Sequence, residues 1–188
     1  MRLFVALPLA TEIRRMLARH TERVRPSLPA ARWLPSENLH LTLRFLGEVE
    51  ATELDAARKA LARAVEGRTG FDLALGEPGR FPRRGPPRVL WIGVEAGTAL
   101  FELQSAISSA LEEALDLEQE RRAYHPHVTL GRCRDLWRRS DAELWTNETF
   151  AGTGESFGVT YVDLMESRLS PAGATHDRVD RLPLEPMC

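Results

Sequence analysis

Cysteine is scarce in this sequence of 188 residues, and the scarcity excludes two kinds of stabilisation. Only Cys133 and Cys188 are present. Two cysteines make neither a disulfide framework nor a zinc site built on cysteine ligands. The sequence therefore predicts a reducing compartment, and we expect a cytoplasmic protein.

Long hydrophobic runs are missing as well. No stretch approaches the roughly 18 consecutive apolar residues that mark a transmembrane helix. The apolar run at the N-terminus, MRLFVALPLA, has one basic residue and is broken by Pro8. It is too short for a secretory signal and is more typical of a first strand. We expect a soluble protein that does not bind membranes.

Charge of one sign is not in excess either, since 25 Lys and Arg residues stand against 27 Asp and Glu residues. This balance gives no overall signal for a nucleic-acid or membrane partner. The arginines nevertheless form two clusters, which suit solubility or contact with a phosphate backbone, and the sequence leaves both open. Arg80, Arg83, Arg84 and Arg88 lie in the loop EPGRFPRRGPPR, and Arg132, Arg134, Arg138 and Arg139 lie further on.

Apolar periodicity predicts strands mixed with helices. Strands are predicted at Leu3–Leu7, Arg32–Leu34, Leu39–Leu46, Phe71–Leu75, Arg88–Val94, Pro126–Arg132, and over FGVTYVDLMESRL and DRVDRLPL. Helices are predicted from Thr11, at Thr52–Val65, from Thr98 and at Asp141–Glu148.

The tetrapeptide pattern His-x-Thr-Leu occurs twice, in HLTLRFLG from His40 and in HVTLGRC from His127. After each copy the sequence predicts a helix and then, at nearly the same distance, a strand that begins at Phe71 or Phe157. This repetition indicates a tandem duplication with two lobes. No flexible linker separates the copies, so we expect residues 1–188 to form a single compact two-lobed domain.

Side chains alternate between the two faces of a strand. In the first copy this places His40, Thr42 and Arg44 together on one face. In the second copy it places His127 and Thr129 together. The residues between them would face the core, namely Leu39, Leu41, Leu43 and Phe45 in the first copy and Val128 and Leu130 in the second. Each copy thus offers an imidazole beside a hydroxyl on a rigid strand.

Two imidazoles across a cleft suit one chemistry in particular. Near neutral pH one ring can accept a proton while the other donates one. An in-line displacement at phosphorus needs both steps, one on the attacking oxygen and one on the leaving oxygen. Two threonine hydroxyls and an arginine can stabilise the charge on the remaining phosphate oxygens, and no metal is required.

The sequence resembles the two-histidine phosphoesterases, specifically the RNA 2′,3′-cyclic phosphodiesterase (2′-5′ RNA ligase) family. The resemblance covers nearly the whole chain and includes RLFVALPL, RWLPSENLHLTLRFLGEV, FPRRGPPRVLWIGV, HPHVTLGR and FGVTYVDLMESRLSPAG. It implies an α+β fold with a bilobal pseudo-twofold duplication, in which two antiparallel sheets line a central cleft and helices pack outside. It also implies hydrolysis of RNA 2′,3′-cyclic phosphate ends to 2′-phosphomonoesters, with reversible 2′-5′ RNA ligation.

The resemblance assigns a role to five residues. His40 would donate a proton to the leaving ribose 3′ oxygen, and His127 would accept the proton of the attacking water. Thr42, Thr129 and Arg132 would bind the phosphate. Strand alternation instead places Arg132 on the core side, so this last assignment requires the strand to end or twist near Gly131.

His125 and His127 could also be interpreted as a metal-binding pair. No acidic or cysteine companion lies at ligand spacing, so we expect no metal and no cofactor. We expect His125 at the edge of the cleft instead. His20, on the first helix, and His176, in a polar loop, are expected to be structural or solvated.

Two other functions stay open from the residues alone. The chain could act on a different cyclic or 2′-5′ nucleotide, or it could bind RNA ends without turnover. A pure binder needs no titrating histidine pair, because Arg or Lys would serve it better. The histidine pair therefore favours a hydrolase, and the resemblance implies that its partner is RNA or an oligonucleotide with a 2′,3′-cyclic phosphate end. We expect it to be a monomer. Trp33, Phe45 and Trp137 are candidates for stacking on bases, with core packing favoured for Phe45.

Overall fold

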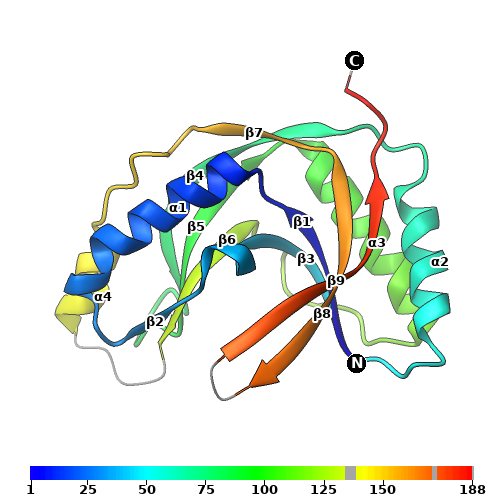
Figure 1. Ribbon diagram of the computed structural model, residues 1–188, viewed down its shortest axis with the longest axis horizontal. Coiled ribbons are helices and arrows are strands. Elements are labelled where there is room, and N and C mark those ends of the chain that lie inside the picture. Colours follow the sequence, from blue (N-terminus) through cyan, green and yellow to red (C-terminus); the bar gives the residue numbers. More distant parts are fainter. Residues whose placement is uncertain (134–138, 171–172, 188) are drawn as a thin grey trace.

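The computed structural model describes residues 1–133, 139–170 and 173–187 (Figure 1). The strands are β1 (Arg2–Pro8), β2 (Ala31–Trp33), β3 (His40–Glu48), β4 (Phe71–Phe81), β5 (Val89–Ala96), β6 (His127–Cys133), β7 (Ser156–Val159), β8 (Tyr161–Ser170) and β9 (Gly173–Pro183). The helices are α1 (Thr11–Val24), α2 (Leu54–Val65), α3 (Thr98–Leu115) and α4 (Arg139–Thr146), with 3-10 turns at Arg25–Ser27 and Ser36–Asn38.

All the strand pairs within the sheet are antiparallel, and the sheet has the order β7-β4-β5-β6-β3-β1-β8-β9, with β2 added on β6. The order is symmetric about its centre: β6 and β3 are flanked by β5 and β1, then by β4 and β8. The predicted α+β class and twofold plan are confirmed. The two expected sheets differ in one respect, because they join into one curled sheet where Leu41 of β3 pairs with Val128 of β6 (Figure 1).

The helices pack outside the curled sheet, as expected, in two pairs (Figure 1). In one pair, His20 of α1 packs its ring on Trp145 of α4, with the centroids 5.9 Å apart, and α4 contacts β4. In the other pair α2 packs on α3, while α3 contacts β3 and α2 contacts β9. Leu100 and Leu111 of α3 are fully buried against the sheet. The inner face of the sheet is therefore left to the motif residues.

The predicted strand over FGVTYVDLMESRL is wrong as a single element, because it divides at Thr160 into β7 and β8. The two pieces have different partners: β7 pairs with β4 at one end of the sheet and β8 pairs with β1 in the other half. The strand that matches β4 by symmetry is therefore β8, which starts at Tyr161 rather than at Phe157. The near-equal spacing after the two motifs does not mark equivalent strands.

The strand predicted at Phe71–Leu75 is longer than expected. Strand β4 continues to Phe81, and an irregularity between Leu75 and Pro78 accommodates the proline in the ladder with β5. The first five residues of EPGRFPRRGPPR thus lie in the sheet, and residues 82–88 connect β4 to β5.

Across the described residues, no helix combines the length and the apolar character that crossing a membrane requires.

Candidate active site

The two motif histidines are the first residues of the two central strands, His40 of β3 and His127 of β6. The residue after each histidine forms the pair that joins the two halves, Leu41 opposite Val128. The histidines consequently lie on either side of this junction. They are within electrostatic reach of each other, since the charge of His127 contributes to lowering the pKa of His40.

Both imidazoles are held by the same kind of hydrogen bond, to the backbone carbonyl oxygen of the residue two positions earlier. Nδ1 of His40 donates to the carbonyl oxygen of Asn38 at 2.8 Å, and Nδ1 of His127 donates to that of His125 at 2.7 Å. A carbonyl oxygen can only accept, so the proton of each neutral ring resides on Nδ1. Nε2 of each ring is then left with its lone pair, available to accept a proton or, once protonated, to donate one.

Strand β3 contains a bulge at the leucine of its motif. Ala6 of β1 pairs with Thr42 and the next residue, Val5, pairs with Arg44, so Leu43 has no opposite residue. An extra residue of this kind reverses the alternation beyond it. His40 and Thr42, both half-buried, precede the bulge and keep the predicted common face, whereas Arg44 and Phe45 exchange faces.

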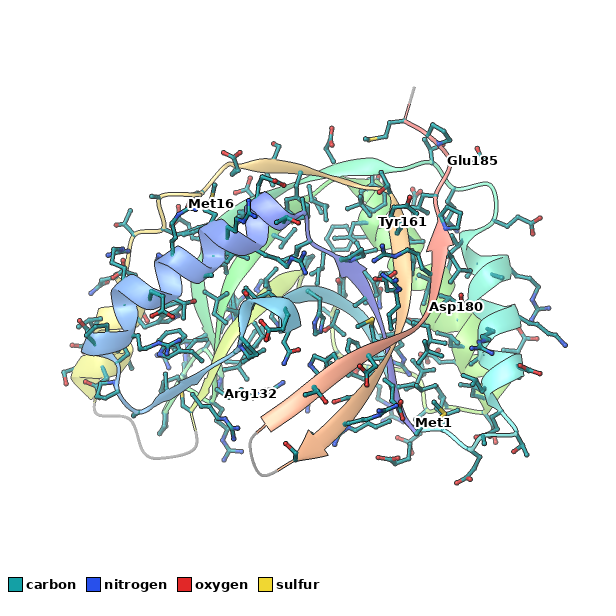
Figure 2. The ribbon with its side chains drawn as sticks, viewed as in Figure 1. Met1, Met16, Arg132, Tyr161, Asp180 and Glu185 are labelled. Atoms are coloured by element: carbon teal, nitrogen blue, oxygen red, sulfur yellow. The ribbon has the colours of Figure 1, made fainter. Side chains whose placement is uncertain are left out.

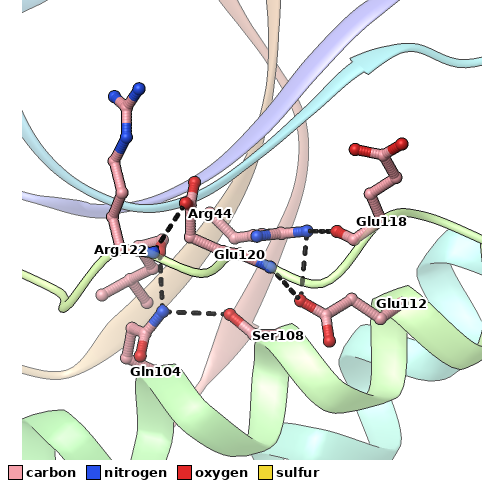
Figure 3. A network of polar contacts seen from close by, with 8 residues as sticks. Arg44, Gln104, Ser108, Glu112, Glu118, Glu120 and Arg122 are labelled. Atoms are coloured by element: carbon pink, nitrogen blue, oxygen red, sulfur yellow. Dashed lines mark hydrogen bonds and ion pairs between the residues drawn. The ribbon is translucent and has the colours of Figure 1, made fainter.

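Arg44 was expected beside His40, and that prediction is wrong. Its side chain is 8% exposed and lies on the helix side of the sheet, where Nη2 is 3.1 Å from Oε1 of Glu112 in α3 and donates to the carbonyl oxygen of Glu118 at 2.7 Å. Figure 3 shows this network, in which Gln104 also donates to the carbonyl oxygen of Leu43 at the bulge. Arg44 is thus a structural residue that anchors α3 and its following loop to β3.

Phe45 was expected in the core, and this prediction is also wrong, because the bulge leaves the residue 64% exposed. Its centroid is 6.0 Å from that of Phe4, and Phe4 in turn lies 4.8 Å from His40. Phe45 therefore extends the surface on which His40 lies. Trp33, the second aromatic candidate, packs on Trp145 at 5.8 Å.

Strand β6 has the same bulge at the equivalent place. Trp91 of β5 pairs with Thr129 and the next residue, Leu90, pairs with Gly131, so Leu130 has no opposite residue. Gly131 is buried and Arg132 is exposed, the reverse of simple alternation. The bulge supplies the twist near Gly131 that the predicted role of Arg132 requires.

Arg132 lies on the motif face as a result, between the end of β6 and the β8–β9 hairpin (Figure 2). Its positive charge contributes to lowering the pKa values of three histidines: His40, His127 and His176. The guanidinium of Arg132 is thus within electrostatic range of all three imidazoles. Among the described residues no acidic side chain pairs with Arg132.

His176 is the site residue that the sequence did not reveal, since it was expected to be structural or solvated. It lies on β9 opposite Ser167 of β8, and its ring centroid is 5.3 Å from that of His40 and 5.1 Å from that of Phe4. Asn38 fixes this arrangement, because its Nδ2 donates to the carbonyl oxygen of Ala174 at 2.8 Å. Asn38 therefore holds both His40 and the neighbouring strand β9.

His127 lies against a different wall. Its ring centroid is 5.1 Å from that of Phe81 and 5.9 Å from that of Trp91. His125, expected at the edge of the cleft, packs on the same two aromatic rings at 5.5 and 4.9 Å and is half-buried. The two motifs thus share a backbone geometry but have chemically distinct surroundings.

Burial sets the protonation of both motif histidines. It is the largest cause that lowers the pKa of His40 to about 4, followed by the charge of His176. Burial also lowers the pKa of His127, which the hydrogen bond to His125 partly opposes. Both rings are neutral at neutral pH, and a bound anion would raise both pKa values. The site is prepared to take up a proton together with a phosphate.

The hydroxyls of Thr42 and Thr129 lie on the same face, one beside each histidine. Neither hydroxyl has a hydrogen-bond partner among the described residues. Tyr124 contacts the backbone of the first motif and not the threonine side chain, since the Tyr124 hydroxyl donates to the carbonyl oxygen of Thr42 at 2.9 Å. The threonine hydroxyls therefore remain available for a ligand.

Within residues 1–133, 139–170 and 173–187, no group of three or more His, Cys, Asp and Glu side chains could hold a metal ion. Three predicted candidates, Trp137, Arg134 and Arg138, lie outside the described residues.

Comparisons with known proteins point to one family. The model of the 2′-5′ RNA ligase superfamily matches residues 12–169. The chain is 32% identical over 143 residues to the RNA 2′,3′-cyclic phosphodiesterase of Thermotoga maritima, which covers 74% of this chain and 75% of that one. It is 34% identical over 129 residues to the enzyme of the same name from Geobacillus stearothermophilus, where the match covers 69% of this chain but only 41% of the relative.

Solved structures agree with this family. The crystal structure of TT0787 of Thermus thermophilus superposes with a TM-score of 0.85 at 28% identity, over 99% of both chains. Escherichia coli LigT complexed with 3′-AMP superposes with a TM-score of 0.79 at 30% identity, over 97% of both chains.

Proposed function

The chain belongs to the 2′-5′ RNA ligase superfamily, and from this premise we propose that it hydrolyses RNA 2′,3′-cyclic phosphate ends to 2′-phosphomonoesters. The observation that carries the proposal is the mirrored pair of histidines, each with Nδ1 bonded to a carbonyl oxygen and Nε2 left free, with Arg132 turned toward them by a bulge. The curated relatives are named for this activity, and the ligand 3′-AMP in the LigT structure is a ribonucleotide.

In the proposed reaction, water attacks phosphorus opposite the bond to the ribose 3′ oxygen. Nε2 of His127 accepts the proton that the water loses, and Nε2 of His40 donates a proton to the 3′ oxygen as the P–O3′ bond breaks. The phosphate stays on the 2′ oxygen. Arg132, Thr42 and Thr129 bind the non-bridging oxygens, on which negative charge increases in the transition state.

The low pKa of His40 fits a proton donor that becomes charged only when substrate is present. The free ring, with a pKa of about 4, is neutral at neutral pH. The anionic cyclic phosphate raises this pKa when it enters, because an opposite charge nearby favours the imidazolium. Substrate and proton thus bind together, and no metal is needed to protonate the leaving oxygen.

The same groups support 2′-5′ ligation. If a ribose 5′-hydroxyl takes the place of water, His127 removes its proton and His40 again protonates the 3′ oxygen. The product is then a 2′-5′ phosphodiester. The reverse reaction exchanges the two roles, as microscopic reversibility requires.

We further propose that residues 1–188 act as one compact two-lobed unit, monomeric and cytoplasmic. The shared sheet supports a single unit, since β3 and β6 contribute one half of the site each. The scarcity of cysteine supports a reducing compartment.

The decisive experiment follows the product. The purified protein is incubated with an oligonucleotide that ends in a 2′,3′-cyclic phosphate, and the terminal monophosphate is identified by phosphorus NMR. We expect a 2′-phosphate, at an unchanged rate in EDTA. A 3′-phosphate would contradict the assignment of the leaving oxygen, and loss of activity in EDTA would contradict the metal-independent mechanism.

A further inference from the structure

The loop that joins β4 to β5 begins and ends at residues of the site. Phe81, the last residue of β4, packs its ring on His127 with the centroids 5.1 Å apart. Val89, the first residue of β5, lies opposite Arg132 in the ladder with β6. The amide of Arg88 closes the base of the loop by donating to the carbonyl oxygen of Phe81 at 2.7 Å. Residues 82–88 therefore project from the His127 side of the site.

This loop has a defined shape. It contains three prolines, which fix backbone angles and lower the entropy that binding would cost. The side chain of Arg80 stabilises the loop, since its Nη1 donates to the carbonyl oxygen of Gly85 at 2.6 Å and to that of Pro82 at 3.4 Å. Arg80 is thus occupied by the loop itself, and the other arginines are presented on a stiffened support.

Three of those arginines are exposed: Arg83, Arg84 and Arg88. None of them forms an ion pair with an acidic side chain in the part of the chain that the structure describes. Arg83 lies near His125, two residues before His127, because its charge contributes to lowering the pKa of His125. A local excess of positive charge on a protein with a net charge of −2 favours a polyanionic ligand at this place.

We propose that the loop 82–88 binds backbone phosphates of the RNA strand that precedes the cyclic end, so that the protein prefers polymer ends to cyclic mononucleotides. The inference rests on the proposed function, because it places a strand whose terminal phosphate lies between His40 and His127. A mononucleotide has no phosphate beyond the cyclic one, which Arg132 and the threonines take. A strand has further phosphates, which the arginines of the loop contact through charge and without reading the bases.

The test compares two double variants that remove the same charge. In R83A/R84A the loop loses two exposed arginines. In the control R15A/R19A two exposed arginines are removed from α1, on the outside of the sheet. For each protein, kcat/KM is measured on 2′,3′-cyclic AMP and on an oligonucleotide with a 2′,3′-cyclic phosphate end, at several salt concentrations.

We expect R83A/R84A to lower kcat/KM for the oligonucleotide about tenfold and to leave the cyclic mononucleotide unaffected. The slope of log(kcat/KM) against log[salt] for the oligonucleotide should become shallower by about 1.4, since each contact to a single strand contributes about 0.7. The control should match the wild type on both substrates. Equal losses in the two double variants, or an equal loss on both substrates, would overturn the proposal.

A binding measurement separates this proposal from the proposed function. Fluorescence anisotropy with an oligonucleotide that ends in a free 3′-hydroxyl detects the loop contact without turnover. Weaker binding by R83A/R84A than by the wild type and the control supports the loop contact even if no cyclic phosphate is hydrolysed. Unchanged binding overturns it even if hydrolysis occurs.

Discussion

In the β3 half and the β6 half of the sheet, a bulge falls on the leucine that follows the motif threonine, Leu43 in one and Leu130 in the other. The bulge turns the second residue after it toward the site, but that residue is Phe45 in the β3 half and Arg132 in the β6 half. The walls differ as well, since His40 packs on Phe4 and His176 and His127 packs on Phe81 and Trp91.

The difference teaches that the backbone of the two halves is duplicated while their chemistry is not. The β6 half brings a cation that can hold a phosphate. The β3 half brings the stronger burial, which lowers the pKa of His40 to about 4. An acid and a base with different properties can thus arise from one repeated motif.

The largest effect is expected from removing either imidazole. H40A and H127A should each lower kcat by about 10²–10⁴-fold, because in the proposed reaction each ring transfers a proton in the same step. The double variant should lose less than the product of the two factors, since the rings act as a unit. Single-turnover hydrolysis of a 2′,3′-cyclic oligonucleotide measures these rates.

H125Q is the matched control for these variants, because His125 holds His127 through its backbone carbonyl and not through its ring. We expect its kcat to stay within about tenfold of the wild type. If one of H40A and H127A hydrolyses at the wild-type rate, the two halves do not share the proton transfers.

The second largest effect is expected from removing an arginine side chain, and it should differ between Arg132 and Arg44, which lie on opposite faces of the sheet because of the bulges. R132A should lower kcat/KM by about 10²-fold or more, because in the proposed reaction it removes a charged donor to the phosphate, and should leave the stability nearly unchanged. R44A should do the reverse: it leaves Glu112 without its buried partner and should lower the free energy of unfolding by about 2–4 kcal/mol. Urea denaturation and steady-state kinetics measure both quantities on both variants.

This pair of variants tests the bulge itself. A loss of kcat/KM in folded R44A as large as that in R132A would mean that Arg44 faces the phosphate, as simple alternation predicted. Preserved turnover in R44A together with lower stability would place it on the helix side.

The smallest effect concerns the third histidine. The groups that face His176 are His40 on β3 and Arg132 on β6, with Asp177 beside it on its own strand. A positive charge on His176 disfavours a second one on His40, so removing it in H176Q should raise the pKa of His40 from about 4 toward the ordinary value of 6.5.

Proton NMR of the imidazole signals measures this shift, with His127 as the internal reference. The signal of His40 should titrate at higher pH in H176Q, while that of His127, whose nearest imidazole neighbour is His125, should move little. A downward shift for His40 would show that His176 stabilises the imidazolium of His40 instead.

The sequence correctly placed His40 with Thr42, and His127 with Thr129, on a common face of a strand, because alternation is reliable over a few residues from the start of a strand. It failed for Arg44 and Phe45 because a bulge depends on the register with the neighbouring strand, and a register is a property of two segments. The same bulge resolved the conflict over Arg132, which alternation placed on the core side and the family resemblance placed in the site.

Long-range pairing explains the other differences. His176 enters the site only because β9 folds back along β8 and is held by Asn38, more than a hundred residues earlier in the chain. The strand over FGVTYVDLMESRL divides because its two parts pair with β4 and β1, which lie in different halves of the sheet. No local pattern of residue types encodes such partners.

The junction between the two halves has a mechanical consequence. The halves meet in the sheet at a single pair, Leu41 and Val128, which are the immediate neighbours of His40 and His127. A rotation of one half against the other displaces each atom in proportion to its distance from the axis, and the two imidazoles lie next to that axis. The outer rim, formed by the β8–β9 hairpin and the loop after β4, lies farthest from this axis and would be displaced most. Such a rotation would therefore change the separation of the two imidazoles less than the separation of the two parts of the rim.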